Sequence, residues 1–263
     1  MTITFDEAQV FPAERTAVVT GAGAPRGIGR HVARRLARSG WNLALADIDG
    51  ASVEAYAAEL AAESGRTVVG YGVDIVDRSA VERLFVEIDA DLPPLAALVN
   101  LAGVASPHAL FEIDDAVWDR VFDVNAKGAL WMIQAAARRF IDGGFGGRVV
   151  NTSSITAYDG GGTFSKTAYA AAKAAVLGLT RGAARELGAY GITVNAIVPG
   201  PIDTDIMGGA LTEERKEGMS ANIPLRRVGQ PQEVAGLVNF LVGEESSFVN
   251  GDSIFVDGGK HMV

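Results

Sequence analysis

Short apolar runs alternate with longer stretches of helical periodicity from residue 15 to the end of the chain. The apolar runs are rich in Val, Ile and Ala and are continuous rather than alternating, which is typical of parallel strands covered on both faces. The pattern predicts strands at 16–20, 42–46, 67–73, 97–100, 148–151, 193–197 and 253–256. Between them it predicts helices at 30–39, 52–64, 79–89, 116–140, 169–187 and 231–241.

Strand–helix alternation with right-handed crossovers predicts an α/β fold: a doubly wound parallel sheet with helices on both faces. No Pro/Ser-rich linker divides the chain and no fixed repeat is present, so we expect a single domain over residues 15–263, preceded by an N-terminal arm over 1–14. Ligands of such sheets bind outside the carboxyl ends of the strands. Residues that directly follow strands are therefore the candidates for a site.

The supply of metal ligands is poor. The chain has no cysteine and three histidines, His31, His108 and His261, which are far apart in sequence. Disulfides, thiolate metal sites and a cysteine nucleophile are excluded, and we expect no metal. The absence of cysteine also suits a reducing compartment, so we expect a cytoplasmic protein.

The charge balance disfavours two classes of partner. A net charge of −9 repels phosphate backbones and anionic lipids, so we expect neither nucleic-acid nor membrane binding. No apolar run approaches the roughly 18 residues that a membrane-spanning helix needs. The first residues carry Asp6 and Glu7 and lack a basic region followed by an apolar core, which favours a short arm over a signal peptide.

A glycine-rich turn follows the first predicted strand. Residues 20–29 read TGAGAPRGIG. Glycines allow a sharp turn and let the backbone approach a pyrophosphate, and a helix beginning near Gly27 directs its N–H groups toward the phosphates. A purely structural turn is the alternative. The position of this turn between a strand and a helix favours dinucleotide binding.

Acidic residues follow the second and third predicted strands. Asp47 can accept hydrogen bonds from both ribose hydroxyls of an adenosine and would repel a 2′-phosphate, although it could also be a helix N-cap. Asp74 is placed to bond an adenine amino group or to be an ordinary turn residue. Arg26, within the glycine turn, could pair with a 2′-phosphate or be a solvated loop residue. We expect NAD rather than NADP, because the charge of Asp47 lies where that phosphate would have to go.

Candidate chemistry begins after the fifth predicted strand. Ser154 follows that strand, and Tyr169 and Lys173 lie four residues apart on the next predicted helix, so they share one face. An ammonium beside the phenol favours phenolate and lowers the tyrosine pKa from about 10. Tyr169 can then act as a general base toward an alcohol and as a general acid toward a carbonyl, while Ser154 hydrogen-bonds the substrate oxygen. A core tyrosine with a surface lysine is the alternative.

These motifs together resemble the short-chain dehydrogenase/reductase family, in its short single-domain branch, over residues 15–259. Other matching motifs occur in the same order as in the family: Asp74-Ile75, Asn100 with Ala102-Gly103, Asn125, Asn195, Pro199-Gly200 with Thr204, and Val256-Asp257-Gly258-Gly259. The resemblance implies a Rossmann-type sheet and an NAD(P)-dependent oxidoreductase that interconverts a secondary alcohol and a ketone by hydride transfer.

The resemblance also implies roles for residues. Asn125, Ser154, Tyr169 and Lys173 would form the catalytic tetrad. Asn125 would hold a water that links Lys173 to solvent, and Lys173 would also bond the nicotinamide ribose. Ile202 and Thr204 would fix the carboxamide. The expected cofactor-binding residues are Gly21, Gly23, Arg26, Gly27, Ile28, Gly29, Asp47, Ile48, Asp74, Ile75, Asn100, Ala102, Gly103, Tyr169, Lys173, Pro199, Gly200, Ile202 and Thr204.

Three features depart from the family pattern. The glycine turn has five residues between Gly21 and Gly27, more than usual, although Gly23 restores the usual count in a shifted register. Leu101 replaces the second Asn of the common NNAG. Ser154 precedes Tyr169 by fifteen residues, also more than usual. The extra residues fall within 158–167, where three successive glycines predict a flexible insertion beside the substrate.

Other functions remain open at this stage. Within the family, the chain could be a 3-oxoacyl-thioester reductase acting on an acyl carrier protein. Carrier proteins are acidic, and this acidic chain has only the pairs Arg138-Arg139 and Arg226-Arg227 as basic patches, so we favour a small alcohol, polyol, hydroxy acid or steroid-like substrate. From another class, the chain could be a non-catalytic dinucleotide sensor or scaffold, but nucleotide binding requires neither Ser154 nor Asn125.

Two further expectations concern the lid and the assembly. The polar, glycine-containing segment 205–227 follows the expected nicotinamide-binding turn and predicts a lid over the substrate, with a solvated surface helix as the alternative. The family resemblance implies a homotetramer built on the helices around 116–140 and 169–187. The alanines at 168, 170–172, 174 and 175 agree with close helix approach.

Overall fold

The computed structural model describes residues 11–162, 165–206, 209 and 211–262. Within them, seven strands form one parallel sheet in the order β3-β2-β1-β4-β5-β6-β7, and the predicted doubly wound fold is confirmed. The strands are β1 (Thr16–Thr20), β2 (Asn42–Asp47), β3 (Val68–Gly72), β4 (Leu95–Asn100), β5 (Gly147–Thr152), β6 (Ile192–Pro199) and β7 (Ser253–Val256).

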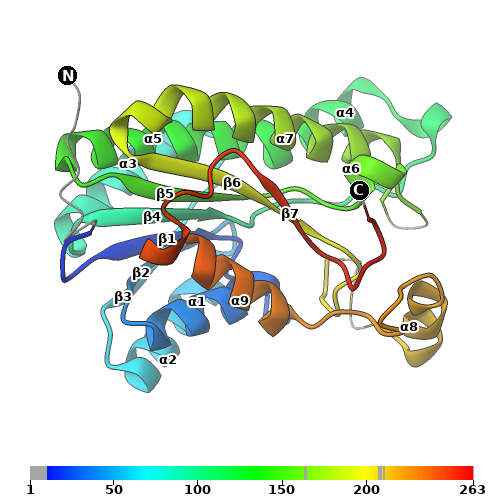
Figure 1. Ribbon diagram of the computed structural model, residues 1–263, viewed down its shortest axis with the longest axis horizontal. Coiled ribbons are helices and arrows are strands. Elements are labelled where there is room, and N and C mark those ends of the chain that lie inside the picture. The colour runs from blue at the N-terminus through cyan, green and yellow to red at the C-terminus, as the bar shows by residue number, and fades with distance from the viewer. Residues whose placement is uncertain (1–10, 163–164, 207–208, 210, 263) are drawn as a thin grey trace.

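Helices cover both faces of the sheet (Figure 1). They are α1 (Ile28–Arg38), α2 (Gly50–Ser64), α3 (Arg78–Asp91), α4 (Asp115–Phe122), α5 (Gly128–Gly143), α6 (Thr156–Asp159), α7 (Thr167–Leu187), α8 (Glu213–Ser220) and α9 (Pro231–Leu241). Helices α1, α2 and α9 pack on one face, and α3, α5 and α7 on the other. None of these described helices is long and apolar enough to cross a membrane.

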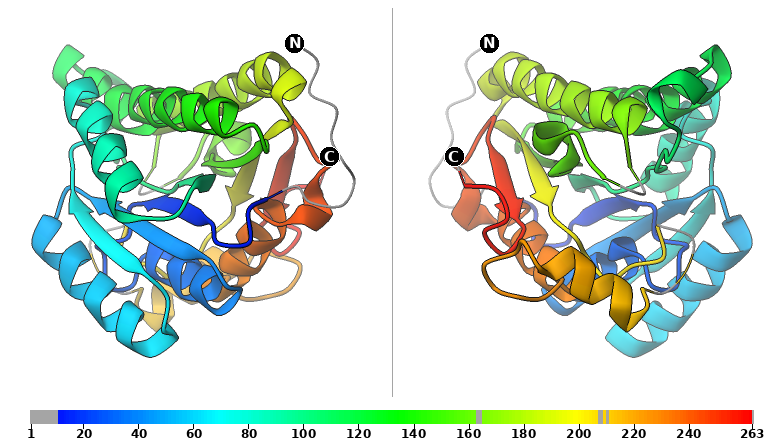
Figure 2. Two further views of the ribbon diagram at one scale, coloured as in Figure 1. Left: turned by 90° about the vertical axis from the view of Figure 1, so that its left-hand side faces the viewer. Right: turned by 90° about the vertical axis from the view of Figure 1, so that its right-hand side faces the viewer.

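The core has two layers because each central strand is buried on both sides. Ala17 and Val19 of β1 pack toward α1 and α9, whereas Val18 packs toward α3 and α5. All five residues of β1 are buried, which explains the continuous apolar run in the sequence. The end-on views of Figure 2 show the sheet twisting between its two helical layers.

Local signals explain where several helices begin and end. The carboxylates of Asp49 and Asp77 accept hydrogen bonds from backbone N–H groups in the first turns of α2 and α3, respectively, and so satisfy donors that lack an intrahelical partner. Gly65 ends α2 at a φ of 67°, in the left-handed region that favours glycine.

The helix predicted over 116–140 is two helices. Helices α4 and α5 are separated by a π-turn over Asp123–Lys127. Within it, the Asn125 side chain donates to Val121 O at 2.9 Å, the carbonyl four residues earlier, which accommodates the wider turn. Single-turn π-bulges are frequent at functional sites. Hydrophobic periodicity continues through the turn, so the sequence pattern did not show it.

The N-terminal arm is described only from residue 11. Phe11 is buried against Trp41, with ring centroids 5.9 Å apart. The rest of the expected arm, residues 1–10, lies outside the described residues.

Candidate active site

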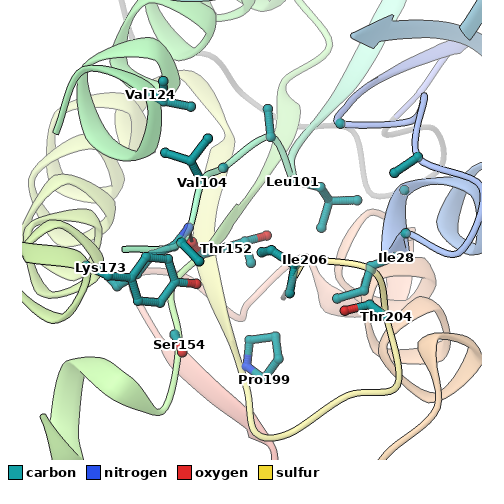
Figure 3. Close-up of a pocket in the computed structure, with 18 of the residues that line it drawn as sticks. Ile28, Leu101, Val104, Val124, Thr152, Ser154, Lys173, Pro199, Thr204 and Ile206 are labelled. Atoms are coloured by element: carbon teal, nitrogen blue, oxygen red, sulfur yellow. Dashed lines mark hydrogen bonds between the residues drawn. The ribbon is translucent and has the colours of Figure 1, made fainter. Parts of the chain in front are cut away.

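A cavity of about 970 Å³ opens at the carboxyl ends of the strands. It is lined by residues that follow β1 through β6, as the strand–helix alternation predicts. Of the expected site residues, only Arg26, Asn100 and Asn125 do not line it. Figure 3 shows side chains from widely separated segments pointing into this space, among them Ile28, Leu101, Ser154, Lys173, Pro199 and Thr204.

The glycine turn is tight enough to exclude side chains at two positions. Gly21 has a φ of 72°, and a Cβ there would lie 2.8 Å from Ala102 N. A Cβ at Gly29 would collide with the Gly21 carbonyl oxygen. The first turn of α1 can therefore close directly onto the end of β1, leaving a backbone cradle that fits a pyrophosphate.

Asp47 holds this turn against the end of β2. Its Oδ2 accepts a hydrogen bond from Gly23 N at 2.7 Å, and its Oδ1 accepts one from Asp49 N at 3.0 Å. The Gly23 carbonyl in turn accepts from Arg30 and from the Ser52 hydroxyl. Each carboxylate oxygen keeps lone-pair capacity for a ligand hydroxyl, in the position expected for an adenosine ribose.

Arg26 does not line the cavity, and its side chain is held by two carboxylates. Its guanidinium pairs with Asp203 at 2.9 Å and with Asp205 at 3.1 Å. The other oxygen of Asp203 pairs with Lys216 of α8 at 3.0 Å. The Asp203 side chain is only 10% exposed, and it joins the glycine turn to the segment after β6 and to α8. No pattern in the sequence indicated this junction, apart from the position of Asp203 directly before Thr204.

Thr20, which begins the glycine-rich motif but was not among the expected site residues, joins β1 to the loop after β4. Its Oγ1 accepts hydrogen bonds from Leu101 N at 3.0 Å and from Ala102 N at 3.1 Å. Backbone donors that would otherwise be unsatisfied are thereby fixed beside the glycine turn. The only available signal was a hydroxyl residue at the end of a buried strand.

Asn100 is buried within the sheet. Its side chain donates to Asn151 of β5 at 2.9 Å, and Asn151 donates to Thr180 of α7 at 3.0 Å. These contacts connect β4, β5 and α7. In the structure, Asn100 is a link between elements and does not line the cavity.

Ser154, Tyr169 and Lys173 converge on the cavity from β5 and α7 (Figure 3). The Ser154 hydroxyl donates to Thr156 Oγ1 at 3.1 Å and lies close enough to the Tyr169 phenol to lower its pKa. Lys173 Nζ lies 5.5 Å from the centroid of the Tyr169 ring and donates to Thr152 O at 2.9 Å. Both Tyr169 and Lys173 are buried.

Burial dominates the ionisation of this pair. It raises the pKa of Tyr169 to about 12, against the opposing effect of the Ser154 hydrogen bond, and it lowers the pKa of Lys173 to about 8. The direction for Tyr169 is opposite to the one expected from the four-residue spacing. The reason is that both groups are removed from water and the ammonium bonds the Thr152 carbonyl rather than the phenol.

Asn125 lies behind Lys173 rather than in the cavity wall. Its side chain donates to the carbonyls of Val104 and Val121, each at 2.9 Å, and its Oδ1 accepts from Val104 N at 3.3 Å. Gly103 separates it from Lys173: a Cβ there would lie 2.7 Å from Asn125 Oδ1 and 3.3 Å from Lys173 Nζ. The π-turn therefore holds the loop after β4 close to the lysine.

Two segments border the far part of the cavity. Within the expected lid, Asp205, Ile206 and Met219 line it, and α8 forms part of the segment; residues 207, 208 and 210 lie outside the described residues. Within the expected insertion, Asp159 and Ser165 line it, and residues 163–164 lie outside the described residues.

Comparison with known proteins agrees with the geometry. The family model described as "Enoyl-(Acyl carrier protein) reductase" matches residues 21–261. The (3R)-3-hydroxyacyl-CoA dehydrogenase of Mus musculus is 38% identical, covering 94% of this chain and 96% of that relative. The 3-oxoacyl-[acyl-carrier-protein] reductase FabG of Staphylococcus aureus is 37% identical over 94% of this chain and 98% of its own.

A solved structure is similar over its full length. The short-chain type dehydrogenase/reductase of Mycobacterium marinum superposes with a TM-score of 0.89 at 29% identity, covering 98% of this chain and all of that one. The chain belongs to the short-chain dehydrogenase/reductase family. It is an oxidoreductase, as the resemblance implied.

The buried lysine makes stability depend on pH. Unfolded Lys173 holds its proton up to its ordinary pKa of 10.5, whereas the folded group loses it near 8. Between these values the unfolded state binds more protons, so stability rises with pH in this window. We expect the unfolding free energy of the wild type, relative to Lys173→Met, to increase from pH 8 to pH 10, as measured by urea denaturation. A constant difference would contradict this ionisation.

Proposed function

We propose that the protein interconverts a secondary alcohol and a ketone with NAD(H), using Tyr169 as the acid/base. The observation that carries the proposal is the convergence of Ser154, Tyr169 and Lys173 at one end of a cavity whose other end is a side-chain-free glycine cradle. That cradle and the Asp47 carboxylate fit the pyrophosphate and ribose of a dinucleotide. Its nicotinamide, when bound, supplies or accepts the hydride.

The protein's own groups handle the proton. A buried phenol with a pKa of about 12 keeps its proton at neutral pH, which suits donation to a carbonyl oxygen. The Ser154 hydroxyl donates to the same substrate oxygen and stabilises the charge that develops on it. The phenolate that remains lies near the Lys173 ammonium, which is 5.5 Å from the centroid of the ring and whose charge favours it. In the reverse direction the phenolate accepts the proton of the alcohol.

A 3-oxoacyl-thioester reductase is the second candidate, because the matching family model and the S. aureus relative both name acyl carrier protein. Docking of an acidic carrier requires exposed cations. Arg227, one of the few candidates, is already bound by both oxygens of Glu233 at 2.7 Å. The described surface therefore offers this partner less positive charge than the sequence suggests. A non-catalytic sensor or scaffold would have no use for the Ser154–Tyr169 contact.

NAD is the proposed cofactor rather than NADP. Asp47 holds a negative charge at the proposed ribose position, and the guanidinium of Arg26, the cation that the sequence suggested for a 2′-phosphate, is shared between two carboxylates. Both features oppose a bound phosphate.

Replacing Asp47 with Ala removes that charge. We expect the wild type to use NAD with the higher kcat/KM, and Asp47→Ala to narrow or reverse the gap, because repulsion of the 2′-phosphate disappears. Steady-state kinetics with both cofactors measure the effect, and Asp49→Ala is a neighbouring control. A wild type that prefers NADPH by tenfold or more would contradict the proposal.

Tyr169→Phe removes one hydroxyl and keeps the ring. A positioned acid/base contributes about 10²–10⁴-fold, and the substrate oxygen also loses a hydrogen-bond partner. We expect a loss of at least about 10³-fold, mainly in kcat, with folding and NAD binding retained. Tyr158→Phe is a control in the neighbouring helix. Retention of more than a tenth of the wild-type kcat would refute the role of Tyr169.

We propose a cytoplasmic homotetramer. On α4, the Trp118 side chain is 40% exposed and stacks on Phe122 at 4.5 Å, and Phe111, before this helix, is fully exposed. On α7, nothing lies within 4 Å of a Cβ built at Gly178 or Gly182, so a second helix could approach closely. We expect sedimentation to give a tetramer at micromolar concentration, whereas a monomer would contradict the proposal.

A further inference from the structure

Opposite charges meet at the border of the cavity beyond Ser154. Asp159, at the end of α6, and Lys260, after β7, both line the cavity, and Lys260 Nζ lies 3.2 Å from Asp159 Oδ2. Their side chains are 32% and 27% exposed, respectively. The pair is therefore partly removed from water and still accessible from the cavity. The reaction described above uses neither residue.

Lys260 is held in place by the chain around it. Asp257 accepts hydrogen bonds from Gly259 N at 2.9 Å and from His261 N at 2.7 Å, which folds the tail back on itself. The His261 ring then lies 5.1 Å from Tyr158 of α6. The tail thus lies against the helix that carries Asp159.

Asp159 is fixed from the other side. Its Oδ1 accepts a hydrogen bond from Gly161 N at 2.8 Å, so the carboxylate does not rotate freely. Lys260 has two further ammonium N–H donors, and each oxygen of Asp159 has a further lone pair. A fixed donor and a fixed acceptor therefore lie side by side, and each can form a further hydrogen bond to a ligand.

A hydroxyl group both donates and accepts hydrogen bonds, so one hydroxyl can accept from the ammonium and donate to the carboxylate. We propose that Lys260 and Asp159 form a hydroxyl-binding subsite and that the substrate is a neutral polyol that bears hydroxyls beyond its reacting carbon. This inference rests on the proposed function, because it places the reacting carbon at Ser154 and Tyr169.

The charge of the pair decides between substrate classes. The ammonium and carboxylate cancel, so an anionic substrate would gain attraction from one group and repulsion from the other at nearly the same distance. An acyl chain would bring methylene groups against two charges that need hydrogen-bond partners. A neutral hydroxylated molecule satisfies both groups.

The test compares alcohols that differ by one hydroxyl. Cyclohexanol, cis-1,2-cyclohexanediol and the anion 3-hydroxybutyrate are oxidised with NAD⁺ by the wild type, Lys260→Met and Asp159→Asn. Lys166→Met is the matched control, since Lys166 belongs to the same insertion and does not line the cavity. Saturation-transfer NMR of each alcohol reports binding independently of turnover.

We expect the diol-to-cyclohexanol ratio of kcat/KM to fall at least about tenfold in Lys260→Met and Asp159→Asn, mainly through KM, and to stay constant in Lys166→Met. A ratio within twofold of the wild type in both variants would overturn the subsite. The subsite would also be overturned if the wild type preferred 3-hydroxybutyrate to the diol and the Lys260→Met variant did not.

Failure of the chemistry has a different signature. Suppose that the wild type oxidises none of the alcohols, but NMR shows that it binds the diol and that Lys260→Met does not. This result would support the subsite and contradict the proposed reaction. Oxidation of cyclohexanol without any preference for the diol would support the reaction and overturn the subsite.

Discussion

The divergence of the chain on the two sides of β1 determines where chemistry can occur. From β1 the sheet extends through β2 to β3 on one side and through β4 to β7 on the other. The loops that leave β1 and β4 therefore separate, and a crevice forms between them at the carboxyl ends. At the base of that crevice, the Thr20 hydroxyl accepts hydrogen bonds from the loop after β4 and so holds the two loops together. The nucleotide cradle and the reactive tyrosine lie in one cavity as a result.

Removal of water shapes the reactivity of that cavity more than any single charge. The Lys173 ammonium and the Tyr169 phenol are neighbours, yet each has a pKa shifted toward its neutral form by burial. At neutral pH a phenol with a pKa of about 12 keeps its proton, and an amine with a pKa of about 8 keeps most of its charge. The Thr152 carbonyl, which accepts a hydrogen bond from Lys173, opposes complete loss of the lysine's charge.

The sequence predicted features that depend on local pattern. Continuous apolar runs located the strands, and the residues after them located most of the cavity lining. Features that depend on distant partners were missed, because the contacting residues lie far apart in sequence. These features are the ion pairs of Arg26, the hydrogen bond of the buried Asn100 side chain to Asn151, and the contact of Lys260 with Asp159. The raised pKa of Tyr169 was missed for a related reason, because spacing on a helix reveals proximity but not desolvation.

The ion pairs of Asp203 couple the position of α8 to that of the glycine turn. One carboxylate restrains both the glycine turn through Arg26 and α8 through Lys216, so a displacement of the helix pulls on the turn. The two cations are half to three-quarters shielded, so dissolved ions screen these attractions only in part. A rise in ionic strength therefore weakens the link between α8 and the glycine turn without removing it.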